Sequence, residues 1–194
     1  GLGTLVCLSK QKQPNIIILL TDDQGYGDIG RHGHPLLKTP NMDRLYDESV
    51  RFDNFYVSPS CSPTRASLMT GMHEFKNGVT HTIEPREHLN IDATILPQLL
   101  KTAGYRTGFI GKWHLGDSPA QLPQGQGFEH YLTSPWGHLA EPNAYVDSTS
   151  PVWEWEPDPR LSTERFTART LDFIEESVQL GAPFLAVLAY STPH

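Results

Sequence analysis

Apolar residues gather along this chain in runs that are typical of β-strands. Residues 15–20 (NIIILL) form a continuous aliphatic run that ends at TDDQG, which predicts a strand buried on both faces of a parallel sheet. Residues 105–116 (YRTGFIGKWHLG) and 183–194 (PFLAVLAYSTPH) predict two more strands, the latter of them also buried. Residues 50–57 (VRFDNFYV) alternate between apolar and polar side chains, which predicts a strand as well.

Helix signals lie between these runs. Capping residues, a proline at the first helical position, apolar residues at helical spacing and terminal glycines predict helices over residues 39–49, 63–71, 92–104 and 162–181. Residues 117–160 are rich in Pro, Gly and Trp without a clear period, which predicts long surface loops. Strands that alternate with helices predict an α/β fold with a mainly parallel sheet flanked by helices.

Composition narrows the class of protein. With 194 residues, 38% apolar and 19% charged, the chain is typical of a soluble globular domain. The net charge of −7 argues against nucleic acid as a partner, and no apolar stretch reaches the ~20 residues that span a bilayer. Residues 1–13 pass from a short apolar run to a polar linker and resemble the tail of a secretory leader, which predicts export to a periplasm, the cell surface or the medium. Cys7 is a candidate for lipid attachment.

Chemically versatile side chains follow three of the predicted strands. Asp22 and Asp23 end the first strand, Lys112 and His114 end the second, and His194 ends the last. Because ligands bind beyond the carboxyl ends of parallel strands, we expect these side chains to share one edge of the sheet. Two adjacent aspartates alone are explained equally well as turn formers or helix caps. The functional site is favoured because several such side chains are expected at the same edge.

Cys61 lies directly before a predicted helix start, with Ser62 as its cap and Pro63 at the first helical position. Free N–H groups at such a start attract anions, and Arg65, about one turn in, adds a cation suited to tetrahedral oxyanions. A thiolate beside a histidine is a candidate nucleophile. Two carboxylates and a thiolate nevertheless match one metal poorly, so an oxygen species at position 61 fits the surroundings better.

Residues 61–71 (CSPTRASLMTG) match the pattern Cys-x-Pro-Ser/Thr-Arg followed by Thr-Gly, the signature of the type I, formylglycine-dependent sulfatases. The segments PNIIILLTDDQGYGDIG, TPNMDRL, GYRTGFIGKWHLG and YSTPH also resemble this arylsulfatase-like family, in its usual order. The resemblance implies an alkaline-phosphatase-like fold, with residues 14–194 as the N-terminal portion of the catalytic domain.

The resemblance also implies a role for each candidate residue. Cys61 would be oxidised by a formylglycine-generating enzyme to formylglycine, an aldehyde used as its hydrate. Asp22, Asp23 and an oxygen of residue 61 would bind calcium, rather than magnesium. Arg65 would support the hydrate, and Lys112 would bind sulfate oxygens.

The resemblance implies a small-molecule or carbohydrate sulfate ester as the substrate. It also implies a hydrolytic mechanism in which two histidines transfer protons. One hydroxyl of the hydrate attacks sulfur, while the metal and the basic side chains offset the charge of the sulfate. His194 binds the substrate and protonates the departing alcohol, and His114 takes the proton of the second hydroxyl so that sulfate is eliminated.

The sequence also departs from the family pattern. A later Asp-Asn or Asp-Asp pair, a second lysine and the small C-terminal domain have no counterpart, so we expect the N-terminal part of a sulfatase, truncated before its C-terminal part. For a serine that contacts sulfate in some members, Ser134 is the candidate. Three alternatives stay open: a phosphate or phosphonate ester hydrolase of the same superfamily, a catalytically incomplete fragment that only binds sulfate, and a plain thiol hydrolase, which would leave Asp22 and Asp23 without a role.

Overall fold

A single six-stranded sheet organises the chain in the computed structural model, which describes residues 13–134, 144–148, 150–155 and 162–194. The strand order is β1-β6-β2-β3-β4-β5. The first four strands in this order are parallel to one another, whereas β4 is antiparallel to β3 and β5 is antiparallel to β4. The prediction of an α/β fold with a mainly parallel sheet is confirmed. The strands are β1 (Ile16–Asp22), β2 (Arg106–Lys112), β3 (His130–Ser134), β4 (Ala144–Asp147), β5 (Ser150–Trp155) and β6 (Phe184–Pro193).

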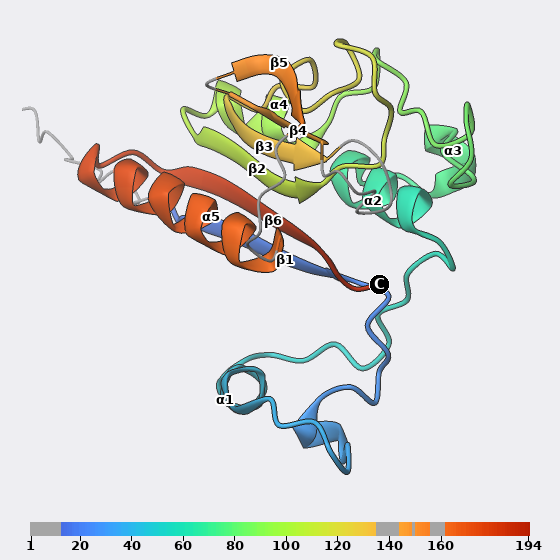
Figure 1. The fold of residues 1–194 in the computed structure, drawn as a ribbon, viewed down its shortest axis with the longest axis vertical. Helices are drawn as coiled ribbons and strands as arrows, with labels where there is room; N and C mark the ends of the chain where they lie inside the picture. The colour runs from blue at the N-terminus through green and yellow to red at the C-terminus, as the bar shows by residue number, and fades with distance from the viewer. Residues whose placement is uncertain (1–12, 135–143, 149, 156–161) are drawn as a thin grey trace, which may run out of the picture.

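Helices cover both faces of this sheet (Figure 1). Along β6, Leu185, Val187 and Ala189 face a core built with α2 and α4, and the alternate side chains face α5. This alternation is the two-residue period of a strand, here with both faces buried. Within the described residues, no helix is both long and apolar enough to cross a membrane. The helical segments are η1 (Gly30–His32), α1 (Pro40–Glu48), α2 (Cys61–Thr70), α3 (Glu74–Asn77), α4 (Leu96–Thr102) and α5 (Ser162–Gln179).

Strand β1 forms where the aliphatic run predicts it, but the prediction that both of its faces are buried is wrong. β1 is the outermost strand of the described sheet. Ile16 and Ile18 pack into the core on one face, whereas Ile17 and Leu19 on the other face are 51% and 61% exposed. The helix on that face, α5, packs against β6, β2 and β3 instead. An aliphatic run by itself does not say which neighbours will cover it.

The predicted strand over residues 50–57 is wrong for a related reason. These residues form a turn and irregular chain rather than a strand, and Phe52 and Tyr56 are 77% and 85% exposed. The alternating pattern is present, but a strand also needs a neighbour with which to exchange backbone hydrogen bonds. Figure 1 shows this segment and α1 extending away from the sheet.

The prediction that residues 117–160 are surface loops is wrong in part. β3, β4 and β5 all lie within this range. Leu122 and Phe128 are 3% exposed and belong to the core, where Phe128 contacts the rings of Phe109 and Trp113. Proline and glycine mark the turns between these elements, and they obscured the short strands.

Gly111 permits the close approach of β2 and β6 just before the carboxyl edge. A Cβ atom on Gly111 would lie 1.8 Å from the backbone oxygen of Ala189, and its φ of +120° is a conformation that other residues rarely adopt. The hydroxyl of Thr133 on β3 donates to the carbonyl of Gly111 at 2.9 Å. The parallel strands β6, β2 and β3 are therefore in close contact at Gly111, one residue before Lys112.

Candidate functional site

Three parallel strands deliver the candidate residues to one edge of the sheet. Asp22 is the last residue of β1, Lys112 is the last residue of β2, and His194 directly follows β6. Figure 1 shows the C-terminal residue close to the end of β1 and to the segment that leads into α2. The sequence-based expectation that the strands bring these side chains to a common edge is therefore met by the geometry.

Asp22 is the centre of a buried charged cluster. Lys112 Nζ donates a hydrogen bond to Asp22 Oδ2, and Arg65 Nη2 lies 3.4 Å from the same oxygen. Cys61 Sγ lies 3.4 Å from Asp22 Oδ1. Burial alone would raise the pKa of Asp22, but the hydrogen bond from Lys112 and the charges of Arg65 and Lys112 outweigh it and lower the pKa. Asp22 is therefore held as a carboxylate.

Lys112 and Arg65 are almost completely shielded from solvent, at 1% and 5% exposure. Arg65 Nη1 donates to the backbone oxygen of Lys112, so α2 is tied to the end of β2. Lys112 Nζ also lies 3.3 Å from Cys61 Sγ. Two cations and one carboxylate thus surround the sulfur, and the sequence anticipated all three residue types at this edge.

Cys61 is the first residue of α2, and Ser60 is the N-cap. The expectation that Ser62 caps this helix with Pro63 at its first position is wrong by two residues. Because the helix starts earlier, Cys61 itself belongs to the first turn, whose N–H groups have no partner within a helix. Burial raises the pKa of the Cys61 thiol, and the nearby Lys112 ammonium only partly opposes this effect. Among the described residues Cys61 forms no disulfide, and Cys7 lies outside them.

Four side chains at this edge are close enough to share a metal ion. One ligand atom from each of Asp22, Asp23, Cys61 and His194 lies within 4.8 Å of the other three. His194 Nδ1 is paired with a carboxylate oxygen of Asp23, so the structure places His194 directly beside the predicted metal ligands. Asp23 adopts a positive φ of 54°, which is uncommon for a residue with a side chain.

His114 lies beyond the end of β2, which stops at Lys112, so the expectation that His114 belongs to this strand is not met. It too has a positive φ, of 57°. Burial, followed by the charges of Lys112 and Arg65, lowers the pKa of His114 to about 4. Within the described part of the chain its Nδ1 is buried without a hydrogen-bond partner, and a backbone hydrogen bond with Thr82 opposes the lowering of the pKa only in part. The ring is therefore neutral at neutral pH, close to the two cations but outside the group of four ligand atoms.

A cavity of about 280 Å³ opens at this edge. It is lined by the ends of β1 and α2, including Asp22, Asp23, Cys61 and Arg65, and by the segment from Val57 to Ser60. The volume corresponds to several water molecules at ~30 Å³ each, enough for a tetrahedral oxyanion. The segment before Cys61 was not predicted as part of the site, although its Ser-Pro-Ser turn pattern marks an ordered loop there. Ser134, at the end of β3, pairs with Lys112 in the sheet register and is 5% exposed.

This chain is similar in sequence and in fold to proteins that are already known. The sequence model of the Sulfatase family matches residues 14–194. The chain is 34% identical to N-acetylgalactosamine-6-sulfatase from Mus musculus over 100% of its own length and 42% of that relative, and 32% identical to arylsulfatase G from Mus musculus over 96% and 42%. It thus spans about two fifths of these relatives. A solved structure of a protein with its substrate, D-glucosamine-2-N,6-O-disulfate, superposes with a TM-score of 0.77 at 31% identity, covering 94% of this chain and 35% of that one. This chain belongs to the sulfatase family.

Proposed function

We propose that this chain carries the nucleophile and the sulfate-binding edge of a sulfuric ester hydrolase. The observation that carries the proposal is the convergence of Asp22, Asp23, Cys61 and His194, whose ligand atoms lie within 4.8 Å of one another at the carboxyl edge of a parallel sheet. Membership of the sulfatase family supports it. Because the chain spans 42% of its mouse relatives, the activity of the whole protein is part of the proposal.

Cys61 is, in this proposal, the precursor of the nucleophile rather than the nucleophile itself. A raised thiol pKa leaves little thiolate at neutral pH, which disfavours a plain thiol hydrolase. Oxidation by a formylglycine-generating enzyme would place an aldehyde at position 61, and its hydrate would supply an oxygen nucleophile for sulfur. The same oxygen would remove the mismatch between a sulfur ligand and two carboxylates.

Asp22 and Asp23, with the oxygen at position 61, would hold a calcium ion. Calcium prefers carboxylate and other oxygen ligands, and the two aspartates have the chemistry and the proximity that such a site needs. When bound, the ion would offset negative charge on the sulfate. Lys112 and Arg65, fixed by burial beside Asp22, would contribute two further positive charges with little rearrangement.

The two histidines would then handle protons in opposite senses. His114 is neutral at neutral pH because its pKa is lowered to about 4, so its ring is able to accept a proton from the hydrate. His194, held by Asp23, would bind the substrate and donate a proton to the departing alcohol oxygen. One residue accepts while the other donates, which is what the cleavage of an ester by addition and elimination requires.

The substrate class that we propose is a carbohydrate or small-molecule sulfate ester. One relative is an N-acetylgalactosamine-6-sulfatase, and one similar structure holds D-glucosamine-2-N,6-O-disulfate as its substrate, so both point to sulfated amino sugars. We therefore propose a 6-sulfated amino sugar as the first compound to test. Export, predicted from residues 1–13, stays a prediction because residues 1–12 lie outside the described part of the chain.

The first experiment tests the nucleophile. The chain is expressed beside a formylglycine-generating enzyme and digested with trypsin, and the peptide of residues 52–65 is weighed. We expect a mass lowered by the conversion of the thiol to an aldehyde, and no such change in the Cys61→Ala variant. An unmodified peptide, with a control sulfatase converted in parallel, would refute the assignment of Cys61.

Two further measurements separate the sulfatase from its alternatives. Sulfate release from 6-sulfated N-acetylgalactosamine is compared with phosphate release from the 6-phosphate, and faster phosphate release would favour the phosphate ester hydrolase. Calorimetric titration with calcium should show weaker binding for Asp22→Asn and Asp23→Asn, whereas the exposed Asp92→Asn control should match the wild type. If the chain binds calcium and sulfate but hydrolyses neither ester, the alternative of a fragment that only binds sulfate is favoured.

A further inference from the structure

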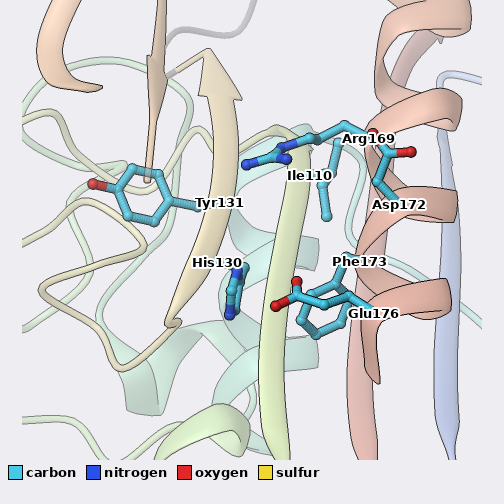
Figure 2. Close-up of a pocket in the computed structure, with 7 residues that line it drawn as sticks. All are labelled: Ile110, His130, Tyr131, Arg169, Asp172, Phe173 and Glu176. Atoms are coloured by element: carbon cyan, nitrogen blue, oxygen red, sulfur yellow. The ribbon is translucent and has the colours of Figure 1, made fainter. Parts of the chain in front are cut away.

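A second polar cluster lies at the opposite end of the sheet from the candidate active site. Arg106 is the first residue of β2, and His130 is the first residue of β3. Figure 2 shows a small cavity between β3 and α5, with His130 on one side and Phe173 and Glu176 of the helix on the other. Arg169, also from α5, extends its guanidinium group toward β3.

Arg106 and His130 are joined in a way that fixes the protonation of the imidazole. Arg106 Nη2 lies 2.9 Å from His130 Nε2. A guanidinium group only donates hydrogen bonds, so Nε2 must accept and the ring must be neutral. Arg106 also contacts α5 at two places, with Nη2 3.0 Å from Glu176 Oε1 and Nη1 2.9 Å from Ser177 Oγ.

Phe173 completes the contact between the helix and the strands. Its ring centroid is 5.2 Å from that of His130 and 5.3 Å from the Arg106 guanidinium carbon. A Cβ atom on Gly108 of β2 would come within 2.8 Å of this ring, so the glycine leaves the space that Phe173 fills. The second half of α5 is thus docked on Arg106 and His130 together.

Protonation of His130 would disrupt this arrangement. The ring would lose its acceptor atom and place a positive charge beside Arg106. Of the nearby carboxylates, Glu176 is already paired with Arg106 and Glu129 is paired with Lys101 at 3.1 Å.

Two further charged residues of α5 line the cavity, Arg169 and Asp172. Arg169 adds another positive charge and pairs with Asp147 at 3.4 Å, whereas Asp172 is exposed to solvent, and an exposed carboxylate attracts a nearby cation only weakly. Burial, followed by the charge of Arg106, lowers the pKa of His130. This direction agrees with the contacts.

We propose that His130 is an acid-sensitive latch, which while neutral holds the second half of α5 on the sheet and when protonated releases it. The first half of the same helix reaches the strand that ends at the candidate active site, through Thr163 and Thr192 at 3.3 Å and through Thr167 and Tyr190 at 2.7 Å. Through His130, a change in pH would therefore alter how α5 packs against β6. The inference does not depend on the proposed function.

Amide hydrogen exchange tests the latch directly. Exchange of the amides in residues 173–179 is measured at pH 7.5 and pH 5 and corrected for the intrinsic effect of pH. The opening equilibrium at pH 5 should rise by up to about tenfold for each unit by which the pKa of His130 lies below its ordinary 6.5, to a limit of about thirtyfold that the 1.5 units between 6.5 and pH 5 set. Amides in β6, which lies in the middle of the sheet, should change much less.

Two variants make the test specific. His130→Gln keeps an acceptor for Arg106 that does not titrate, so the pH-dependent step should disappear. Arg169→Gln removes a charge from the same cavity without touching the contact between Arg106 and His130, so the step should remain. An exchange rate in the wild type that is independent of pH, or a step that persists in His130→Gln, would overturn the proposal. If His130→Gln does not fold, NMR titration of the wild-type ring decides: a pKa of 6.5 or above overturns the latch.

Discussion

Replacing Lys112 by methionine tests the buried charge cluster independently of catalysis. The Lys112 ammonium is 1% exposed and donates to Asp22, and it lies 3.3 Å from Cys61 Sγ. Methionine has a similar length and fills the same space without a charge. The change therefore leaves the Asp22 carboxylate buried with Arg65, 3.4 Å away, as its remaining cation among the described residues.

The expected cost follows from these contacts. Removing one partner of a buried ion pair costs about 3–5 kcal/mol when the other charge is left without compensation. Arg65 still compensates, because at 3.4 Å and an effective dielectric constant of about 20 its gross attraction to Asp22 is about 5 kcal/mol. We therefore expect Lys112→Met to lower the free energy of unfolding by about 2–3 kcal/mol.

Urea unfolding in calcium-free buffer at pH 7 measures this change. At an m value of about 2 kcal/mol/M, the midpoint should fall by about 1–1.5 M. Lys101→Met is the matched control: its pair with Glu129 is 3.1 Å long, but the lysine side chain is 51% exposed, so the loss should stay below about 1 kcal/mol.

A double-mutant cycle with Asp22→Asn separates the charge pair from other effects of the substitution. Because each single variant leaves an opposite charge poorly compensated, the double variant should lose at least about 1 kcal/mol less than the sum of the two single losses. Additive losses would contradict the reasoning, as would a Lys112→Met variant within about 0.5 kcal/mol of the wild type.

Three further predictions follow from the fold. The pKa of folded His114 is about 4, below its ordinary 6.5, so its contribution to stability is complete above pH 6.5 and is lost as the pH falls toward 4. Thermal unfolding over this pH range should therefore show a free energy of unfolding that falls by about 1–3 kcal/mol in the wild type and by much less in His114→Gln. Gly111→Ala should prevent stable folding, seen as lost near-ultraviolet circular dichroism, since its Cβ would overlap the Ala189 carbonyl. Leu19→Lys, at a side chain that is 61% exposed on the outermost strand of the described sheet, should change the free energy of unfolding in urea by no more than about 0.5 kcal/mol.

Local pattern was sufficient for much of the fold. Apolar runs predicted where β1, β2 and β6 lie along the chain, and β2 and β6 are buried on both faces, as strands inside a parallel sheet are. The helix α5 was predicted from its capping residue and its apolar spacing, both of which are local. The candidate site was predictable for a similar reason: Asp22 and Lys112 each end a strand, and parallel strands place their carboxyl ends together.

Other predictions failed where the outcome depends on neighbours distant in sequence. Residues 50–57 have the pattern of a strand but lack a pairing partner among the described residues, and β1 is covered on one face because α5 lies over other strands. The short strands β3, β4 and β5 have their own pairing but no clear period within a segment rich in Pro and Gly.

The sequence by itself determined which residue types follow each strand, because the end of an apolar run is marked locally by the polar residues after it. Only the tertiary structure decided how they pair there. Lys112 forms an ion pair with Asp22, and His194 pairs with Asp23. His114 lies beyond the end of β2, and its pKa is lowered. The contact between Arg106 and His130 was likewise invisible in the sequence. Hydrogen bonding, burial and charge interactions depend on distances of a few ångströms between segments that are far apart along the chain, and no local pattern contains those distances.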